Sequence, residues 1–526
     1  MSRPSAIGKA VVLLVALTSR LSAQDHAHAK PGAEQLGTVH FPTSCSAAVT
    51  PTFDRAIALL HSFEFGASIG AFNEVLASDS TCAMAHWGIA LSRWGNPTSA
   101  ANRAPRALDP GRIAANSATR LSAGATDRER GYIAAVNQLF ADYEQRDQRT
   151  RIVAYEAAMA DLVAKQPTDT EARIFHALAQ VGKAPPTDKT YALQIAAGTT
   201  LEKLWEQQPN HPGLAHYIIH AYDVPALADR ARAAAARYAR IAPSAAHALH
   251  MPSHTFTRVG LWQESINTNL RSMNEAKRTG SMAEALHAAD YATYAYLQLR
   301  RDDSAKAMVD SMPAYAARFD VNAVTGAAPG WAGLFALASI PARYALERGD
   351  WKLASSLRPT ATSVPYTEAQ TYFARALGAS RTGDVATARA NIDSLGAIHG
   401  RLVAQKEAYW TEQVAIQRLA AQSWLALAER RPDSALAHMR EASTREDATE
   451  KSPVTPGPLA PAHELAGDLL MELGKPADAL TEYRKTLTKE PGRYRSLLGA
   501  RNAARKMGDK KTEAEFAKQL PVGHGR

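Results

Sequence analysis

The stretch that decides the fold class spans residues 463–491 and reads HELAGDLLMELGKPADALTEYRKTLTKEP. Gly467 and Ala479 are small residues at positions where two helices would cross, and Leu470 and Tyr483 supply the large side chains beside them. Small residues let two helices approach closely. Pro491 ends the second helix, because proline cannot continue the hydrogen-bond ladder. The stretch therefore predicts one antiparallel pair of helices.

The same pattern extends over most of the chain. Similar small-residue spacings occur at Ala342 with Ala354, at Ala376 with Ala388, and around Ala435. Pairs of helices of about 12–15 residues alternate with short breaks from about Pro51 nearly to the end. An array of stacked pairs needs no single large core, so its length is not limited. We predict an all-α solenoid of about ten helical hairpins, some of them degenerate.

Two stretches interrupt the helical period. Residues 319–331 carry two glycines and a proline, and residues 452–461 carry four prolines. The second stretch could fold over the concave face of the array or could act as a spacer. The predicted organisation is a signal peptide (1–23), an irregular tail (24–50), a first helical array (51–318), a break (319–331) and a second array (332–521).

A pair of histidines recurs after one repeat length. His216 and His220 read HYIIH, and His250 and His254 read HMPSH 34 residues later. A spacing of four places two side chains on one face of a helix. A 34-residue period is typical of helix–turn–helix repeats. Two successive repeats are therefore expected to present equivalent imidazole pairs.

These motifs resemble the tetratricopeptide repeat (TPR) family. The longer segments AFNEVLASDSTCAMAHWGIALSRWGNP and HYIIHAYDVPALADRARAAAARYARIAPSAAHALHMPSHTFTRVGLW resemble a group of exported bacterial TPR proteins, over nearly the whole chain after the signal. The resemblance implies that positions 2, 5, 9 and 12 of each first helix line a concave groove. The groove residues predicted from this register are His216, His220, Asp223, His247, His250, His254, His287, Asp290 and Tyr294.

The histidines of this groove have two interpretations. Imidazole is the commonest metal ligand, so His216, His220, His250 and His254 could hold zinc, copper or iron, with Asp223 and Asp290 beside them. They could equally form a polar groove or pack with satisfied hydrogen bonds. Neither pair is an HExxH motif, which leaves no built-in general base. Pro252 interrupts the second pair and could break the shared face.

The N-terminus has the pattern of an export signal. Arg3 and Lys9 precede a short apolar run, and Leu21-Ser22-Ala23 forms a small-residue cleavage site. We expect cleavage before Gln24 and a periplasmic or secreted protein without a membrane span. In such an oxidising compartment Cys45 and Cys82, which flank the first predicted hairpin, could form a disulfide or remain two buried thiols.

Charge and motifs limit the function classes. The formal net charge is +9, and removing the three basic residues of the signal lowers it to +6, with the remaining basic residues scattered. We therefore expect no nucleic-acid partner. The sequence contains no nucleotide-binding or serine-hydrolase motif. The expected function is a scaffold that binds a peptide, protein or small ligand in its groove. The alternative is a metal-binding protein or metalloenzyme, and the sequence leaves open whether the chain is an enzyme.

Overall fold

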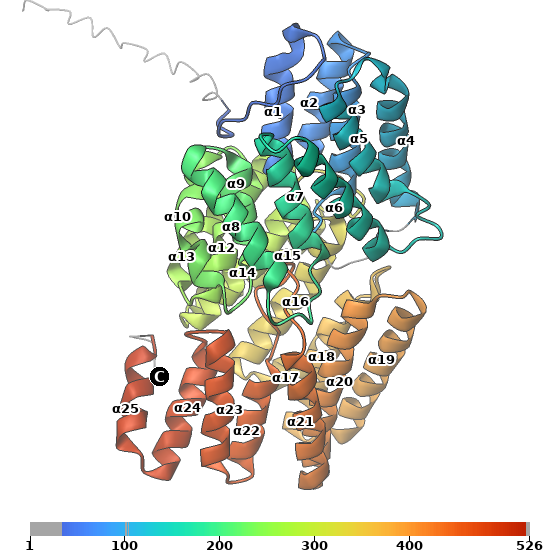
Figure 1. The fold of residues 1–526 in the computed structure, drawn as a ribbon. Helices are drawn as coiled ribbons and strands as arrows, with labels where there is room; N and C mark the ends of the chain where they lie inside the picture. Colours follow the sequence, from blue (N-terminus) through green and yellow to red (C-terminus); the bar gives the residue numbers. More distant parts are fainter. Residues whose placement is uncertain (1–33, 100–102, 104, 522–526) are drawn as a thin grey trace, which may run out of the picture. The chain divides into compact units, whose positions relative to one another are not determined.

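Helical hairpins fill the chain from Thr50 onward in the computed structural model (Figure 1). The structure describes residues 34–99, 103 and 105–521, so the predicted signal peptide lies outside the described residues. These residues form 25 α-helices and contain no β-strand. The predicted all-α repeat solenoid is confirmed. Within the same residues no helix is both long and apolar enough to cross a lipid bilayer.

Helices before the predicted break run from α1 to α15. Their bounds are α1 Thr50–His61, α2 Phe65–Ser78, α3 Ala83–Trp94, α4 Pro105–Leu121, α5 Asp127–Phe140, α6 Gln148–Lys165, α7 Thr170–Lys183, α8 Ala192–Gln207, α9 Pro212–Ala221, α10 Arg232–Ile241, α11 Ala246–His250, α12 Pro252–Arg258, α13 Trp262–Thr279, α14 Met282–Gln298 and α15 Asp302–Ala316.

Ten further helices follow Pro329. Their bounds are α16 Gly330–Arg348, α17 Trp351–Ser356, α18 Pro365–Thr382, α19 Val385–Ala404, α20 Ala408–Ala428, α21 Pro432–Asp447, α22 Ala462–Glu472, α23 Pro476–Lys489, α24 Tyr494–Met507 and α25 Lys510–Gln519. Successive helices pack against each other along both stretches, and α14 packs directly on α16 across the intervening loop.

Close helix approach explains the small residues of the sequence pattern. A side chain on Gly467 would place its Cβ 2.6 Å from the ring of Tyr483, which is itself buried between helices. Only glycine leaves room for the tyrosine at this crossing.

The turn into α5 also agrees with a sequence pattern, because a threonine is followed three residues later by a glutamate. Thr126 accepts from the Glu129 backbone N–H, and the Glu129 carboxylate accepts from the Thr126 N–H.

The segment before α1 is irregular but packed. A 3₁₀ helix at Ala47–Val49 precedes α1, and Leu36 and Phe41 are buried. A disulfide joins Cys45 to Cys82, with a Cα–Cα distance of 5.0 Å across the α1–α2 hairpin. The Thr38 N–H donates to the Asn210 carbonyl at 3.0 Å. The disulfide fastens this segment to the start of α3, and the hydrogen bond fastens it to the start of α9, which carries His216 and His220.

Candidate metal centre

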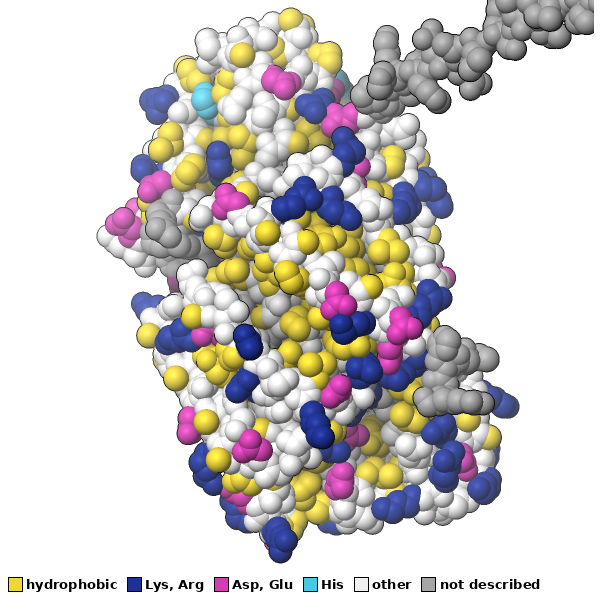
Figure 2. All heavy atoms as spheres, turned by 180° about the vertical axis from the view of Figure 1, so that it is seen from behind, with side chains coloured by type: hydrophobic (Ala, Val, Ile, Leu, Met, Phe, Trp, Pro, Cys, Tyr) yellow, Lys and Arg dark blue, Asp and Glu magenta, His cyan; other side chains and the backbone are white. Residues whose placement is uncertain are grey.

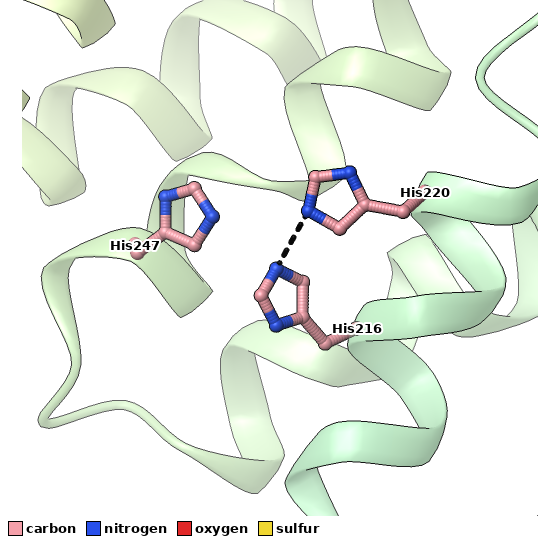
Figure 3. Close-up of side chains that lie close together, drawn as sticks. All are labelled: His216, His220 and His247. Atoms are coloured by element: carbon pink, nitrogen blue, oxygen red, sulfur yellow. Dashed lines mark hydrogen bonds between the residues drawn. The ribbon is translucent and has the colours of Figure 1, made fainter. Parts of the chain in front are cut away.

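Six histidines meet at the contact between α9, α11, α12 and α14. His216 and His220 lie on α9, and His247 and His250 on α11. The remaining two histidines are His254 of α12 and His287 of α14. The first three form one group (triad A) and the last three another (triad B); in each triad one ligand atom per residue lies within 4.8 Å of the others. Triad A is drawn in Figure 3.

Triad A is built on a close contact between two rings of α9. His216 Nε2 lies 3.0 Å from His220 Nε2, and Figure 3 shows both rings directed toward His247. His216 Nδ1 lies 2.6 Å from the carbonyl oxygen of His61, and His247 Nδ1 lies 2.9 Å from Glu284 Oε1. Both partners only accept hydrogen bonds, so a neutral ring places its proton on Nδ1 and leaves Nε2 bare. The buried Nε2 of His247 has no hydrogen-bond partner among the described residues.

Triad B repeats this arrangement one repeat later. His250 Nε2 lies 3.0 Å from His254 Nε2, and the His287 ring centroid lies 4.4 Å from that of His250. The two triads adjoin, because the ring centroids of His247 and His250 are 5.9 Å apart. All six imidazoles therefore form one continuous cluster.

Pro252 does not separate the second pair of histidines. Met251, between α11 and α12, has helical dihedral angles, and its N–H donates to the His247 carbonyl at 2.9 Å. Pro252 is the first residue of α12, where the missing N–H costs nothing. The chain thus continues in a helical path, and His250 and His254 keep a shared face.

The tautomers of His250 and His254 are fixed by their outer partners. His254 Nδ1 lies 2.9 Å from the Asp223 carboxylate. His250 Nδ1 lies 2.7 Å from Asn269 Oδ1, and the orientation of that amide is set because Asn269 Nδ2 donates to the Ser265 carbonyl. Each Nδ1 must donate, so two neutral rings face each other through two bare Nε2 lone pairs.

Burial keeps these imidazoles uncharged. Desolvation lowers the pKa of His216, His220 and His250 well below the usual range, and neighbouring imidazoles lower it further. Burial also lowers the pKa of His287 to about 3. For His254, desolvation outweighs the opposing effect of Asp223, so its pKa is lowered too. Burial therefore disfavours a protonated imidazole that could bridge His250 and His254.

The structure gathers some of the predicted groove residues and separates others. Asp223 joins the cluster, and its carboxylate also contacts Arg258 at 2.9 Å and Lys451 at 3.2 Å. Asp290 instead pairs with Arg343 at 3.0 Å. The Tyr294 hydroxyl donates to Glu490 Oε2 at 2.8 Å. These last two residues therefore belong to ion-pair networks rather than to the histidine cluster.

Two expectations differ from the structure. The predicted groove residues, apart from the half-buried Asp223, are buried instead of lining an open groove, with Asp290 and Tyr294 fully inaccessible. Loops from the two irregular stretches cover them: the Tyr291 hydroxyl donates to the Pro453 carbonyl at 2.9 Å, and the Ala328 N–H donates to Glu284 at 2.9 Å. The four histidines predicted as metal ligands, His216, His220, His250 and His254, also do not come together around a single site. Each pair acquires its own third histidine instead.

Sequence reasoning missed the residues that surround the cluster. Glu284, Asn269 and the His61 carbonyl hold Nδ1 atoms, yet none occupies a recognisable motif. His61 lies in the first hairpin, far from His216 in sequence, but α1 packs on α9. A third group, His61, Glu171 and His211, lies next to triad A and also has metal-ligand spacing. Its contacts arise between helices far apart in sequence, which a repeat register cannot reveal.

A pocket reaches the cluster from outside. Its volume is about 470 Å³, and it is lined by one pair of histidines from each triad, His220 with His247 and His254 with His287. His216 and His250 lie behind them, fully buried.

Histidine side chains are almost absent from the face shown in Figure 2, and Lys and Arg side chains are dispersed there among Asp and Glu.

Comparisons with known proteins find similarity to solved helical structures only, at low identity. No family model and no curated protein matches the chain. The chain is similar to the human IFIT1 dimer with PPP-AAAA at 11% identity and a TM-score of 0.40, over 89% of this chain and 93% of that one. It is also similar to yeast Tom70 at 10% identity and a TM-score of 0.33, over 90% and 99% of the two chains. Similarity this low carries no argument about function.

Proposed function

We propose that the protein binds transition-metal ions in its two histidine triads, one ion in each. The observation that carries this proposal is the contact between His250 and His254. Their Nε2 atoms lie 3.0 Å apart, and both Nδ1 protons are already committed to Asn269 and Asp223. Two lone pairs at this distance repel unless a cation lies between them. A metal ion supplies that cation without requiring a charged imidazole.

Triad A supports the proposal less directly. No partner fixes the tautomer of His220 among the described residues, so its Nε2–H could donate to His216 in an ordinary hydrogen bond. The bare Nε2 of His247 would still lack a partner in that arrangement. A metal ion would satisfy all three nitrogens at once. Triad B is therefore the site on which the proposal depends most.

The ligand set indicates the kind of metal. Three neutral imidazoles suit zinc, copper or iron, and they leave at least one coordination position for water or a small ligand. Acceptors at Nδ1 orient metal-bound histidines, and four of the six histidines here have one. Because both triads face the pocket, the open positions would be reachable from outside. This arrangement is typical of metal sites that act on a ligand rather than of purely structural sites.

The deciding experiment measures metal content. We expect about two equivalents of a transition metal in the untagged protein after reconstitution and removal of excess metal. His254→Ala should lose the ion of triad B, and His216→Ala should lose the ion of triad A. His463→Ala is the matched control, because His463 is equally buried but faces Asp447 and Glu482. Wild-type protein that stays empty after exposure to zinc, copper and iron would refute the proposal.

The second candidate is a scaffold that binds a peptide, protein or small ligand. The loops over the histidine-bearing helices favour the small ligand, because the remaining space of about 470 Å³ is of the size that holds a small molecule. A scaffold of this kind should keep its fold and its ligand after the metal is stripped. Loss of ligand binding on chelation would instead assign the ligand to the metal centre.

We also propose that this is an exported bacterial protein, cleaved after Ala23 and located in the periplasm. The Cys45–Cys82 disulfide supports this proposal, because such bonds persist in oxidising compartments. N-terminal sequencing of the protein from a periplasmic extract should begin at Gln24. Recovery of the uncleaved chain from the cytoplasm would contradict the proposal.

A further inference from the structure

The pocket that reaches the two triads has an unusual charge balance. It is lined by two arginines, Arg93 and Arg103, and by four histidines, but by no aspartate or glutamate among the described residues. Three carboxylates lie near the triads. Asp223 and Glu284 are turned to the outer nitrogens of His254 and His247, Glu64 accepts from the His247 backbone N–H, and none of the three lines the pocket. The lining is therefore positive before any metal ion is added, and it favours an anion.

Arg103 is the cation best placed for a ligand. Its Nε donates to the Trp94 carbonyl at 2.6 Å, and its Nη2 donates to the Asn96 carbonyl at 2.7 Å. Its guanidinium carbon lies 4.3 Å from the centroid of the Trp94 ring. These contacts hold the guanidinium in one orientation. They use two of its three nitrogens.

The third nitrogen of Arg103, Nη1, has no hydrogen-bond partner in the part of the chain that the structure describes. Its Nη1 is buried without a hydrogen bond among the described residues, and the Arg103 side chain makes no ion pair there. Burial, with a smaller effect of Arg151, lowers the pKa of Arg103 to about 9, so the group remains charged at neutral pH. Arg103 is half-buried. Removing a cation from water without a counter-ion is costly, and a carboxylate is the anion that matches guanidinium geometry.

Much of the remaining wall is apolar. Phe65, Trp94 and Trp331 line the pocket, together with Val321 and Val324. Val321 and Val324 are 40% and 48% exposed, which is uncommon for large aliphatic side chains. Largely apolar walls with a few polar or charged groups are typical of sites for small organic molecules, in which the polar groups fix the orientation.

We infer that this pocket binds a small organic carboxylate, with the carboxylate on Arg103 and an apolar body against the aromatic and valine side chains. The position of the ligand beside metal ions rests on the function proposed above, whereas the preference for a carboxylate rests on Arg103 and the lining. A molecule seated there would present its body to His220, His247, His254 and His287.

Calorimetric titration of the purified protein with benzoate, benzamide and acetate tests the inference. Benzamide keeps the ring and removes the charge, and acetate keeps the charge and removes the ring. We expect benzoate to bind about tenfold more tightly than either, because each loses one of the two interactions. Equal affinities for benzoate and benzamide would overturn the inference.

Variants of Arg103 locate the site. Arg103→Gln should weaken benzoate binding by about tenfold or more and leave benzamide binding unchanged. Arg103→Lys keeps the charge and should retain part of the benzoate preference, which guards against a variant that merely unfolds. Arg240→Gln is the control, because Arg240 is exposed and lies outside the pocket. An unchanged preference for benzoate in Arg103→Gln would overturn the inference.

Performing the titrations on metal-free and zinc-loaded protein separates the two proposals. Benzoate binding that depends on Arg103 in protein unable to bind metal would support the carboxylate site and refute the metal centre. Stoichiometric metal binding with no preference for benzoate would support the metal centre and refute the carboxylate site.

Discussion

Two neighbouring histidine clusters with the same spacing differ in what lies between their rings. In the first, His61 Nε2 and His211 Nε2 lie 2.8 and 2.9 Å from the two oxygens of Glu171, so each imidazole donates to the same carboxylate. The Tyr217 hydroxyl lies 3.0 Å from His61 Nδ1 and can donate to it. In triad B, His250 and His254 face each other at 3.0 Å with no acid between them.

The comparison shows that proximity alone does not identify a metal site. Both clusters are buried, and both satisfy metal-ligand spacing. The difference is the number of protons available for the close contacts. The cluster around Glu171 has a donor and an acceptor for each close contact, whereas triad B has two acceptors and no donor. This difference favours a structural role for the first cluster and supports the proposed metal site at triad B.

The largest expected effect comes from breaking the structural cluster. Glu171→Ala removes the acceptor of two buried hydrogen bonds to a charged group, and should lower the free energy of unfolding by about 3–5 kcal/mol. Metal content should not change. Urea unfolding and elemental analysis measure the two quantities. Glu202→Ala, at a partly exposed ion pair with Arg230, should cost less than about 1 kcal/mol. Loss of metal from Glu171→Ala would place an ion in this cluster instead.

A smaller effect is expected outside the ligands of triad B. Asn269→Ala removes the acceptor that fixes His250, and should weaken metal binding at triad B by about 10–100-fold. Competition with a chromophoric chelator measures the change. The matched control is Asn391→Ala, because Asn391 is a buried asparagine that holds Arg375 rather than a histidine. Equal affinities in the two variants would show that His250 is not a ligand.

The stability supplied by Glu171 should depend on pH. Burial alone would raise its pKa, but His61 and His211 outweigh this effect and hold the pKa below the ordinary value of 4.5. The unfolded chain therefore takes up a proton first as pH falls. The stability advantage of wild type over Glu171→Gln should be complete above about pH 4.5 and decrease by about 1.4 kcal/mol per pH unit below it. Urea unfolding at pH 7, 4.5 and 3.5 measures this advantage, and an advantage that grows on acidification would contradict the assignment.

The sequence predicted the repeat fold well because paired helices are neighbours in the chain, so their contacts appear as a short-range spacing of residues. Gly467 and Tyr483 lie in one hairpin, and their contact requires the spacing that the pattern shows. The sequence also revealed the pair His216–His220 and the pair His250–His254, because the two members of each pair lie on one helical path. Membership of the triads was not predictable in this way. His247 and His287 complete them from other helices, and the partners of their outer nitrogens lie on still others.

The sequence pattern also could not predict that the site is buried. A repeat register describes only the stacked helices, and it places position 5 or 9 on a concave surface whether or not a loop covers that surface. The Lys451 side chain reaches Asp223 at 3.2 Å from a segment 228 residues away in the chain. No local spacing records such a contact. Proline-rich composition indicated a loop at 452–461 but left its position open between a cover and a spacer.

The smallest expected effect is also the sharpest test of the difference between the clusters. In a double-mutant cycle on metal-free protein, His250→Ala and His254→Ala should show an unfavourable coupling of about 1 kcal/mol, because two lone pairs face each other. The same cycle with metal bound should show a favourable coupling. A cycle with His61→Ala and Glu171→Ala should be favourable with and without metal. A favourable coupling between His250 and His254 in metal-free protein would mean that a proton bridges the rings, and one imidazolium would then satisfy triad B without a metal ion.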